Sequence, residues 1–420
     1  MKVFKFGGAS ASTIDRIKNI AAIIKSSADE KLLIVISAIG KTTNALEKVA
    51  QAFYEGRNED ALRLFELIKG KHLDILKYLL TINWKPATEE LKNYFTEVEW
   101  LLHEKAVRDY NYYYDQIVCI GELLSTTIIS WYLREENVFN TLVDVRDIFR
   151  TDDNFRNAEV DITFTKDNIV THLIPLFFNS NIVITQGFIG ATDENESTTL
   201  GREGSDFSAA LFANLLDAES LTIWKDVEGI MNADPKEFDD ATYLPLLSYT
   251  EVIEMAYYGA QVIHPKTIKP LENKNIPLFV KCFLKPELPG TIITNAPVHH
   301  LPPIKILKHH QVLLTLSSTD FSFVGEEPIS RLYEIFSELK IRPNLIQSTA
   351  ISLLCCMDDV PEKIEQLALL ASEVFDVRLQ KQLTLLTIRH YTTEILERLI
   401  SGKNIVLEQK TKDTIQVLSI

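Results

Sequence analysis

The chain has 420 residues, enough for two or three domains and a large hydrophobic core. Its composition is that of an ordinary globular protein, with 46% hydrophobic and 24% charged residues. The formal net charge is −15 and no basic block stands out, which argues against nucleic acids and anionic membranes as main partners, because both require a positive surface.

Nucleotides stay possible partners, since they need only a few local cations. The N-terminal residues reach Gly7 too soon for the apolar region of a signal peptide, and no apolar run approaches the ~20 residues of a membrane-spanning helix. We therefore expect a cytoplasmic protein. The four cysteines lie in apolar runs without metal-ligand spacing, which predicts buried, reduced thiols: Cys119, Cys282, Cys355 and Cys356.

The chain begins with a strand, helix, strand pattern. Residues 2–6 predict a short strand, residues 14–25 an amphipathic helix capped by Ser12 or Thr13, and residues 32–37 a buried parallel strand. This order is typical of an α/β sheet.

Lys5 stands at the end of the first strand and is followed by Gly7 and Gly8. Backbone N–H groups at such a turn can hold a phosphate beside the lysine charge. A tight turn with an edge lysine fits equally well. Ser37 and Thr43 follow the second strand, where ligand sites of α/β proteins form, although this segment also fits an ordinary loop before a helix.

Residues 46–115 keep helical spacing and predict a helical insertion. Alternation of strands and helices then returns. Glu122 would stand at a helix start, where it suits the helix dipole or could accept from a substrate ammonium group. The expected elements are strands at 116–120, 141–145, 182–185 and 220–225, and helices at 121–135 and 208–216.

The most informative segment is the glycine-rich stretch 185–206, which follows a buried strand and precedes an apolar helix. Arg202 and Asp206 lie four residues apart in it. Glycines allow backbone N–H groups to approach a ligand, and an arginine near a helix start suits a carboxylate or a phosphate. A polar surface loop with a chance charge pair is the alternative.

A further loop follows the strand at 220–225. In it Asp226 could position a lysine or a cation, and Lys225 and Lys236 could face phosphates, although a surface loop of mixed charge also fits. His264 precedes a proline without visible catalytic partners, which favours a structural histidine.

The prolines between 285 and 303 indicate a linker, and a smaller α+β unit follows. Its pattern alternates between strand and helix signals and contains no obvious catalytic cluster. The expected strands are 312–316, 344–349, 351–357 and 383–388, the expected helices are 331–339 and 361–375, and residues 384–420 predict strand, helix, strand, strand.

Taken in order, these motifs closely resemble aspartokinases of the amino acid kinase superfamily over residues 1 to about 295. The resemblance is carried by six segments: Lys5-Phe6-Gly7-Gly8, Ser37-Ala38 with Thr43-Asn44, Gly121-Glu122-Leu123-Leu124-Ser125, the loop 186–206, Trp224 to Asp234, and Tyr258 to Pro265.

The resemblance implies a three-layer α/β/α kinase domain at 1–295 with a mainly parallel open sheet. It also implies a ferredoxin-like, ACT-type region at 303–420, as two interleaved units. The implied reaction moves the ATP γ-phosphoryl group to the side-chain carboxylate of L-aspartate, which gives 4-phospho-L-aspartate and opens the pathway to lysine, threonine, methionine and isoleucine.

The same resemblance implies roles for single residues. Lys5 and Asp226 would be catalytic, with Asp226 organising the phosphate-binding groups. The nucleotide would contact Gly7, Gly8, Lys225, Met231 and Lys236, and aspartate would contact Ser37, Thr43, Glu122, Arg202 and Asp206. Magnesium would be held mainly by ATP oxygens, with no protein metal site. The family also implies a homodimer, with lysine or threonine as a possible feedback inhibitor.

Four positions depart from the family pattern. Ala9 replaces a usual threonine, Glu203 a common glycine, Lys225 a usual threonine and Gln261 a lysine that many members place near the phosphates. Lys225 or Lys266 could replace that charge. These departures leave two alternatives open, namely a kinase of another small acid and a weakly active amino-acid sensor.

Overall fold

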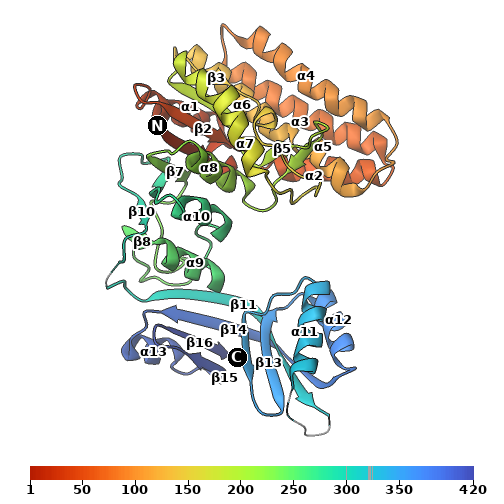
Figure 1. Ribbon diagram of the computed structural model, residues 1–420, viewed down its shortest axis with the longest axis vertical. Helices are drawn as coiled ribbons and strands as arrows, with labels where there is room; N and C mark the ends of the chain where they lie inside the picture. The colour runs from red at the N-terminus through yellow and green to blue at the C-terminus, as the bar shows by residue number, and fades with distance from the viewer. Residues whose placement is uncertain (299, 320–322, 324) are drawn as a thin grey trace. The chain divides into compact units, whose positions relative to one another are not determined.

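The computed structural model describes residues 1–420 except 299, 320–322 and 324, and it consists of two compact units (Figure 1). The first unit comprises Met1–Ile230, Leu244–Ile253 and Ile263–Pro297. The second comprises Met231–Tyr243, Glu254–Val262 and Val298–Ile420. The assignment of a catalytic and a regulatory domain stays a prediction, and the sequence pattern did not indicate that two short segments before residue 263 belong to the second unit.

An eight-stranded sheet forms the centre of the first unit, in the order β3-β4-β2-β1-β7-β9-β10-β8. All neighbouring strands are parallel except β9 and β10. The expected mainly parallel sheet is therefore confirmed. The strands are β1 (Lys2–Phe6), β2 (Leu32–Ile36), β3 (Thr141–Leu142), β4 (Ile182–Gln186), β7 (Ser220–Lys225), β8 (Leu246–Ser248), β9 (Leu278–Cys282) and β10 (Thr291–Thr294).

Strands β2 and β4 are buried along their whole length, as expected for a sheet that is covered on both faces. Helices α1 and α6 pack together, as do α8 and α10, and members of both pairs contact the sheet. The helices of this part of the chain are α1 (Ile14–Lys25), α2 (Thr42–Tyr54), α3 (Asn58–Leu79), α4 (Trp84–His103), α5 (Tyr110–Val118), α6 (Ile120–Glu135), α7 (Ile162–Asn168), α8 (Gly204–Leu215), α9 (Tyr249–Tyr258) and α10 (Pro265–Glu272). A separate hairpin pairs β5 (Ile189–Ala191) with β6 (Ser197–Thr199).

The predicted helical insertion is present as α2 to α5, and α2, α3 and α4 lie side by side (Figure 1). The prediction of a strand at 116–120 is wrong, because these residues end α5 and begin α6. A short apolar run fits a buried helix as well as a strand. The stretch Tyr110–Glu135 is long and apolar enough to cross a membrane, but 89% of its most apolar window is buried within the protein, as in a core helix.

Three other boundaries differ from the prediction. Helix α8 begins at Gly204, so Asp206 lies in its first turn rather than in the loop before it. Strand β3 covers only two residues of the expected 141–145. The proline-rich segment 285–303 is not simply a linker, because it contains β10 of the main sheet. The four cysteines are buried and free, as expected.

A six-stranded antiparallel sheet forms the second unit, in the order β12-β13-β11-β14-β16-β15. Its central strands β11 and β14 are 15 residues long each and pair through two stretches separated by a change of register. The elements are β11 (Ile304–Ser318), α11 (Glu326–Glu338), β12 (Leu345–Ser348), β13 (Ser352–Asp358), α12 (Pro361–Ala371), β14 (Phe375–Arg389), α13 (Thr393–Ile400), β15 (Ile405–Lys410) and β16 (Thr414–Ser419).

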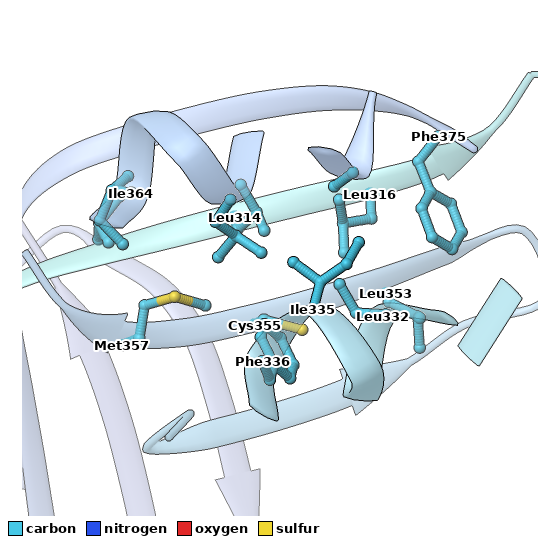
Figure 2. Close-up of a cluster of buried hydrophobic side chains, with 13 residues drawn as sticks. Leu314, Leu316, Leu332, Ile335, Phe336, Leu353, Cys355, Met357, Ile364 and Phe375 are labelled. Atoms are coloured by element: carbon cyan, nitrogen blue, oxygen red, sulfur yellow. The ribbon is translucent and has the colours of Figure 1, made fainter. Parts of the chain in front are cut away.

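One half of this sheet buries its apolar face under α11 and α12, and Figure 2 shows side chains from both helices meeting those of β11 and β13. The other half packs against α13, through a smaller cluster around Ile388 and Ile415. The predicted strand, helix, strand, strand order of residues 384–420 is confirmed. The antiparallel arrangement agrees with the expected ACT-type region.

Candidate functional site

A cavity of about 600 Å³ opens in the first unit at the carboxyl ends of β1, β2 and β7. This is the edge where ligands bind in open α/β sheets. Ten of the twelve residues expected at the site line it: Lys5, Gly7, Gly8, Ser37, Thr43, Glu122, Arg202, Asp206, Lys225 and Asp226. Segments far apart in sequence therefore converge on one cavity.

Two expected nucleotide residues, Met231 and Lys236, are not among the lining residues and belong to the second unit. Met231 forms an isolated bridge with Tyr243, and the Lys236 backbone N–H donates to Asp234. Their role in nucleotide binding stays a prediction.

Lys5 forms an ion pair with Asp206 inside the cavity, with 2.6 Å between Nζ and Oδ1. Both side chains are almost fully buried, and each comes from the end or start of a regular element, β1 and α8. Burial opposes ionisation of Asp206, but the charges of Lys5 and Lys225 hold its pKa below the ordinary value. The ion pair thus holds the Lys5 side chain in place at the cavity lining.

Close packing requires glycine at position 8, whereas Gly7 borders the flexible end of the Lys5 side chain. A Cβ atom on Gly7 would lie 3.3 Å from Lys5 Nζ, and one on Gly8 would lie 2.7 Å from the Ala38 carbonyl oxygen. The Gly40 N–H donates to the Gly8 carbonyl at 2.9 Å, which joins the loops after β1 and β2. Glycine at position 8 therefore allows the two loops to approach closely, and the absence of a side chain at Gly7 leaves space beside the lysine.

Glu122 lies in the first turn of α6, is 3% exposed, and lines the cavity. Burial raises the pKa of Glu122 to about 8, although the Lys5 charge and a hydrogen bond with the Ala38 backbone act in the opposite direction. Its Oε2 has no hydrogen-bond partner among the described residues. A buried carboxylate in this state is suited to receive a cationic group from a ligand.

Arg202 is exposed to the cavity and forms no ion pair with any residue that the structure describes. The next residue, Glu203, has a φ of +55°, in the left-handed region that favours glycine. Its carboxylate accepts from the His264 backbone N–H at 3.2 Å. This contact directs the Glu203 carboxylate to the start of α10.

The remaining charged positions divide between cavity and surface. Lys225 lines the cavity, and Asp226 lies at its edge as an exposed residue. Lys266 donates to the Leu200 carbonyl at 3.2 Å and is not a lining residue. Of the two lysines considered as replacements for the missing charge, Lys225 is the one that lines the cavity. His264 caps α10 by accepting from the Lys266 backbone N–H, which confirms a structural histidine.

Sequence reasoning missed a buried carboxylate and the segment that it holds. Asp115 of α5 is fully buried and accepts from the backbone N–H groups of Arg156 and Thr199 and from the Thr199 hydroxyl, at 2.7–2.9 Å. Arg156 and Thr199 both line the cavity, as does Tyr114. The spacing of these residues over 85 positions gives no local signal, so only the fold brings them together.

Known proteins agree with this geometry. The chain matches the amino acid kinase family over residues 1–282. Lysine-sensitive aspartokinase 3 of Escherichia coli is 33% identical over 359 residues, which cover 85% of this chain and 78% of that protein. Chloroplastic aspartokinase 1 of Arabidopsis thaliana is 32% identical over 390 residues, which cover 89% of this chain and 65% of that protein.

Solved structures agree as well. E. coli aspartokinase III in complex with aspartate and ADP superposes with a TM-score of 0.83 at 28% identity, covering 100% of this chain and 96% of that one. The complex of the same enzyme with lysine and aspartate gives the same TM-score. The sequence matches, together with the shared fold, show that this chain belongs to the amino acid kinase family and, within it, to the aspartokinases.

Proposed function

We propose that this aspartokinase transfers the γ-phosphoryl group of ATP to the side-chain carboxylate of L-aspartate, as the first step of lysine, threonine, methionine and isoleucine biosynthesis. The observation that carries the proposal is the convergence on one cavity of the Lys5–Asp206 pair, the buried Glu122, and Arg202, which has no ion-pair partner among the described residues. These groups match the phosphoryl group, the ammonium and a carboxylate of the two substrates.

The acceptor carboxylate is already ionised at neutral pH, so no general base is required. The difficulty is the approach of an anionic nucleophile to an anionic phosphate, and catalysis then consists of positioning and charge neutralisation. Lys5 would stabilise the charge of the transferring phosphoryl group, with Asp206 fixing its position. Gly7 and Gly8 would supply backbone N–H donors, and Lys225 and Asp226 would border the phosphates.

Arg202 would bind the carboxylate that does not react, and Glu122 would accept from the ammonium group, with Ser37 and Thr43 completing the pocket. Among the described residues no group of three or more His, Cys, Asp and Glu side chains could hold a metal ion. Magnesium would be bound mainly by phosphate oxygens and water.

We also propose that the second unit binds a feedback amino acid, and that the enzyme is a cytoplasmic homodimer. The effector would be lysine or threonine. Support comes from the antiparallel ACT-type sheet and from the E. coli relative, which is lysine-sensitive and was solved with lysine bound.

The proposal is tested by trapping the acyl phosphate with hydroxylamine in the presence of ATP, magnesium and L-aspartate. We expect turnover in the wild type and a loss of about 10²-fold or more in Arg202→Ala. Arg134→Ala is the matched control, because Arg134 is an exposed arginine that stacks on Trp131 away from the cavity. Lysine and threonine are added separately to identify the effector. Folded wild-type protein that phosphorylates another small acid but not aspartate would refute the proposal.

A further inference from the structure

A second arginine, Arg156, lines the cavity beside Arg202. Arg156 is exposed to the cavity, and in the described part of the chain it forms no ion pair, as is also true of Arg202. The other cations of the cavity are accounted for, since Lys5 pairs with Asp206 and Lys225 also interacts electrostatically with Asp206. Arg156 and Arg202 are thus two guanidinium groups available to one ligand.

The backbone of Arg156 is held in an uncommon conformation. Its φ is +69°, in the region where glycine is favoured and a long side chain is strained. The N–H of this residue donates to the buried Asp115 at 2.9 Å, which fixes the strained backbone. Strain that the surrounding structure maintains is concentrated at functional sites, and here it places a guanidinium group at a cavity wall.

The side chain is also fixed. The guanidinium carbon lies 4.4 Å from the centroid of the Tyr114 ring and 5.5 Å from that of Tyr110. One nitrogen donates to the Asn111 side chain at 3.4 Å. A guanidinium has five N–H donors, so stacking and one weak hydrogen bond orient the group while leaving donors for a ligand.

The segments that carry the two arginines touch each other. A Cβ atom on Gly201 would lie 2.8 Å from Asn157 Oδ1 and 3.3 Å from the Arg156 carbonyl oxygen. Arg202 follows Gly201 directly, so both guanidinium groups extend from adjoining backbone. The Lys5–Asp206 pair lines the same cavity, beside Gly7.

We infer that Arg156 is a second substrate-binding arginine, which binds the α-carboxylate of the amino-acid substrate together with Arg202. The inference rests on the proposed function. A substrate with two carboxylates places one at Lys5 for phosphorylation, and the other then needs cationic partners away from it. Two arginines can hold that carboxylate through charge-assisted hydrogen bonds and select against acids that lack it.

The test compares L-aspartate binding by titration calorimetry in the wild type, Arg156→Gly and Arg156→Gln. We expect at least tenfold weaker binding in both variants and an unchanged KM for ATP. In Arg156→Gly the Tm should be equal to or above that of the wild type, because glycine accepts the left-handed backbone. A loss of binding together with an unchanged or higher Tm could not come from unfolding.

Arg108→Gln is the matched control. The Arg108 guanidinium carbon lies 3.7 Å from the ring centroid of Tyr112, which belongs to α5 as do Tyr110 and Tyr114. Arg108, however, pairs with Glu196 and does not line the cavity. It should bind aspartate like the wild type.

The α-amide of L-aspartate, which keeps the reacting carboxylate, identifies the substrate group that Arg156 binds. Wild type should lose at least tenfold in affinity for this amide, whereas Arg156→Gly should lose less.

Wild-type affinity for aspartate, within twofold, in both Arg156 variants would overturn the inference and leave the proposed function intact. The inference would also be overturned if replacing L-aspartate by its α-amide lowered the affinity equally in wild type and in Arg156→Gly. Wild type that binds no aspartate would instead refute the proposed function and this inference together.

Discussion

At the scale of single residues, burial sets the charge of the group that would receive the substrate ammonium. The pKa of Glu122 rises from 4.5 to about 8, mainly through desolvation. The ligand-free enzyme therefore holds this carboxyl largely protonated at pH 7. An ammonium group beside it favours the ionised form, so binding of aspartate should release a proton.

We predict that close to one proton is released per aspartate bound at pH 7. The ionised fraction of a group with a pKa of about 8 rises from roughly a tenth at pH 7 to a half at pH 8, so the affinity should increase about fivefold over that interval. Calorimetry in buffers of different ionisation enthalpy measures the release. Glu122→Gln should bind more weakly, without proton release and with little dependence on pH.

Glu122 should also make the stability of the protein depend on pH in a defined direction. Because the pKa of Glu122 in the folded protein lies above its unfolded value, the folded state binds more protons between about pH 4.5 and 8. The stability of the wild type should therefore fall relative to Glu122→Gln as the pH rises through this range. Urea unfolding at pH 5, 7 and 8.5 would reveal the trend, and parallel curves for the two proteins would contradict it.

The identity of the carboxylate that positions Lys5 is open to a direct comparison. Asp206→Asn should cost about 3 kcal/mol of stability and roughly 10²-fold in kcat, because it leaves a nearly buried lysine without its partner. Asp226→Asn should change stability by no more than about 0.5 kcal/mol, since Asp226 is exposed. Denaturant unfolding and steady-state kinetics measure both. A larger kcat loss in Asp226→Asn than in Asp206→Asn would contradict this prediction and favour Asp226, the catalytic carboxylate that the sequence suggested.

The sequence could identify Lys5, the two glycines and Arg202, because each stands at a strand end or in a glycine-rich loop. It suggested Asp226 as the residue that positions a lysine and placed Asp206 at the substrate, whereas the structure pairs Lys5 with Asp206. Arg156 carried no signal at all. Its role depends on a left-handed backbone and on a contact with Gly201, and neither can be read from the residue types around it.

At the scale of elements, Asp115 joins helix α5 to strand β6 and to the Arg156 segment. Its Oδ2 accepts two backbone N–H groups and its Oδ1 accepts the Thr199 hydroxyl. An asparagine can keep this pattern, with its oxygen toward the N–H groups and its amide donating to the hydroxyl. A leucine leaves two backbone donors and one hydroxyl unsatisfied.

We therefore predict that Asp115→Asn costs less than about 1.5 kcal/mol, whereas Asp115→Leu costs about 3 kcal/mol or more. Both variants are compared by urea unfolding. The leucine variant should also raise the KM for aspartate more than that for ATP, because the displaced segment carries Arg156 and Thr199. Equal stability losses in the two variants would show that volume rather than hydrogen bonding matters at this position.

Sequence periodicity was reliable for elements with one strong pattern, such as α1, β2 and β7, whose bounds differ by a residue or less from the prediction. It failed at 116–120, where the apolar run belongs to two consecutive buried helices. The failure has a physical cause, because a helix buried all round has no polar face to show its period. The first turn of α8 was missed since it begins with Gly204 and Ser205, which are poor helix formers.

At the scale of the whole molecule, the chain passes between the two units five times, although the prolines at 285–303 suggested a single boundary. The segments 231–243 and 254–262 are held by the second unit's own residues. Lys305 pairs with Asp240, Arg389 pairs with Glu254 at 2.9 Å, and the Lys305 N–H donates to the Asn232 carbonyl. Phe238 packs against the core beneath α13.

A cut at the apparent linker should therefore damage the remaining part. We predict that a fragment of residues 1–297 unfolds at a Tm at least 5 °C below that of the full chain, because the two segments lose their hydrogen bonds, ion pairs and the packing of Phe238. Limited proteolysis should cleave the fragment first within 231–243 or 254–262. The full chain under the same protease is the control. A fragment with an unchanged Tm and uncut segments would mean that the first unit holds these residues without the C-terminal sheet, and that the boundary suggested by the prolines is the true limit of the domain.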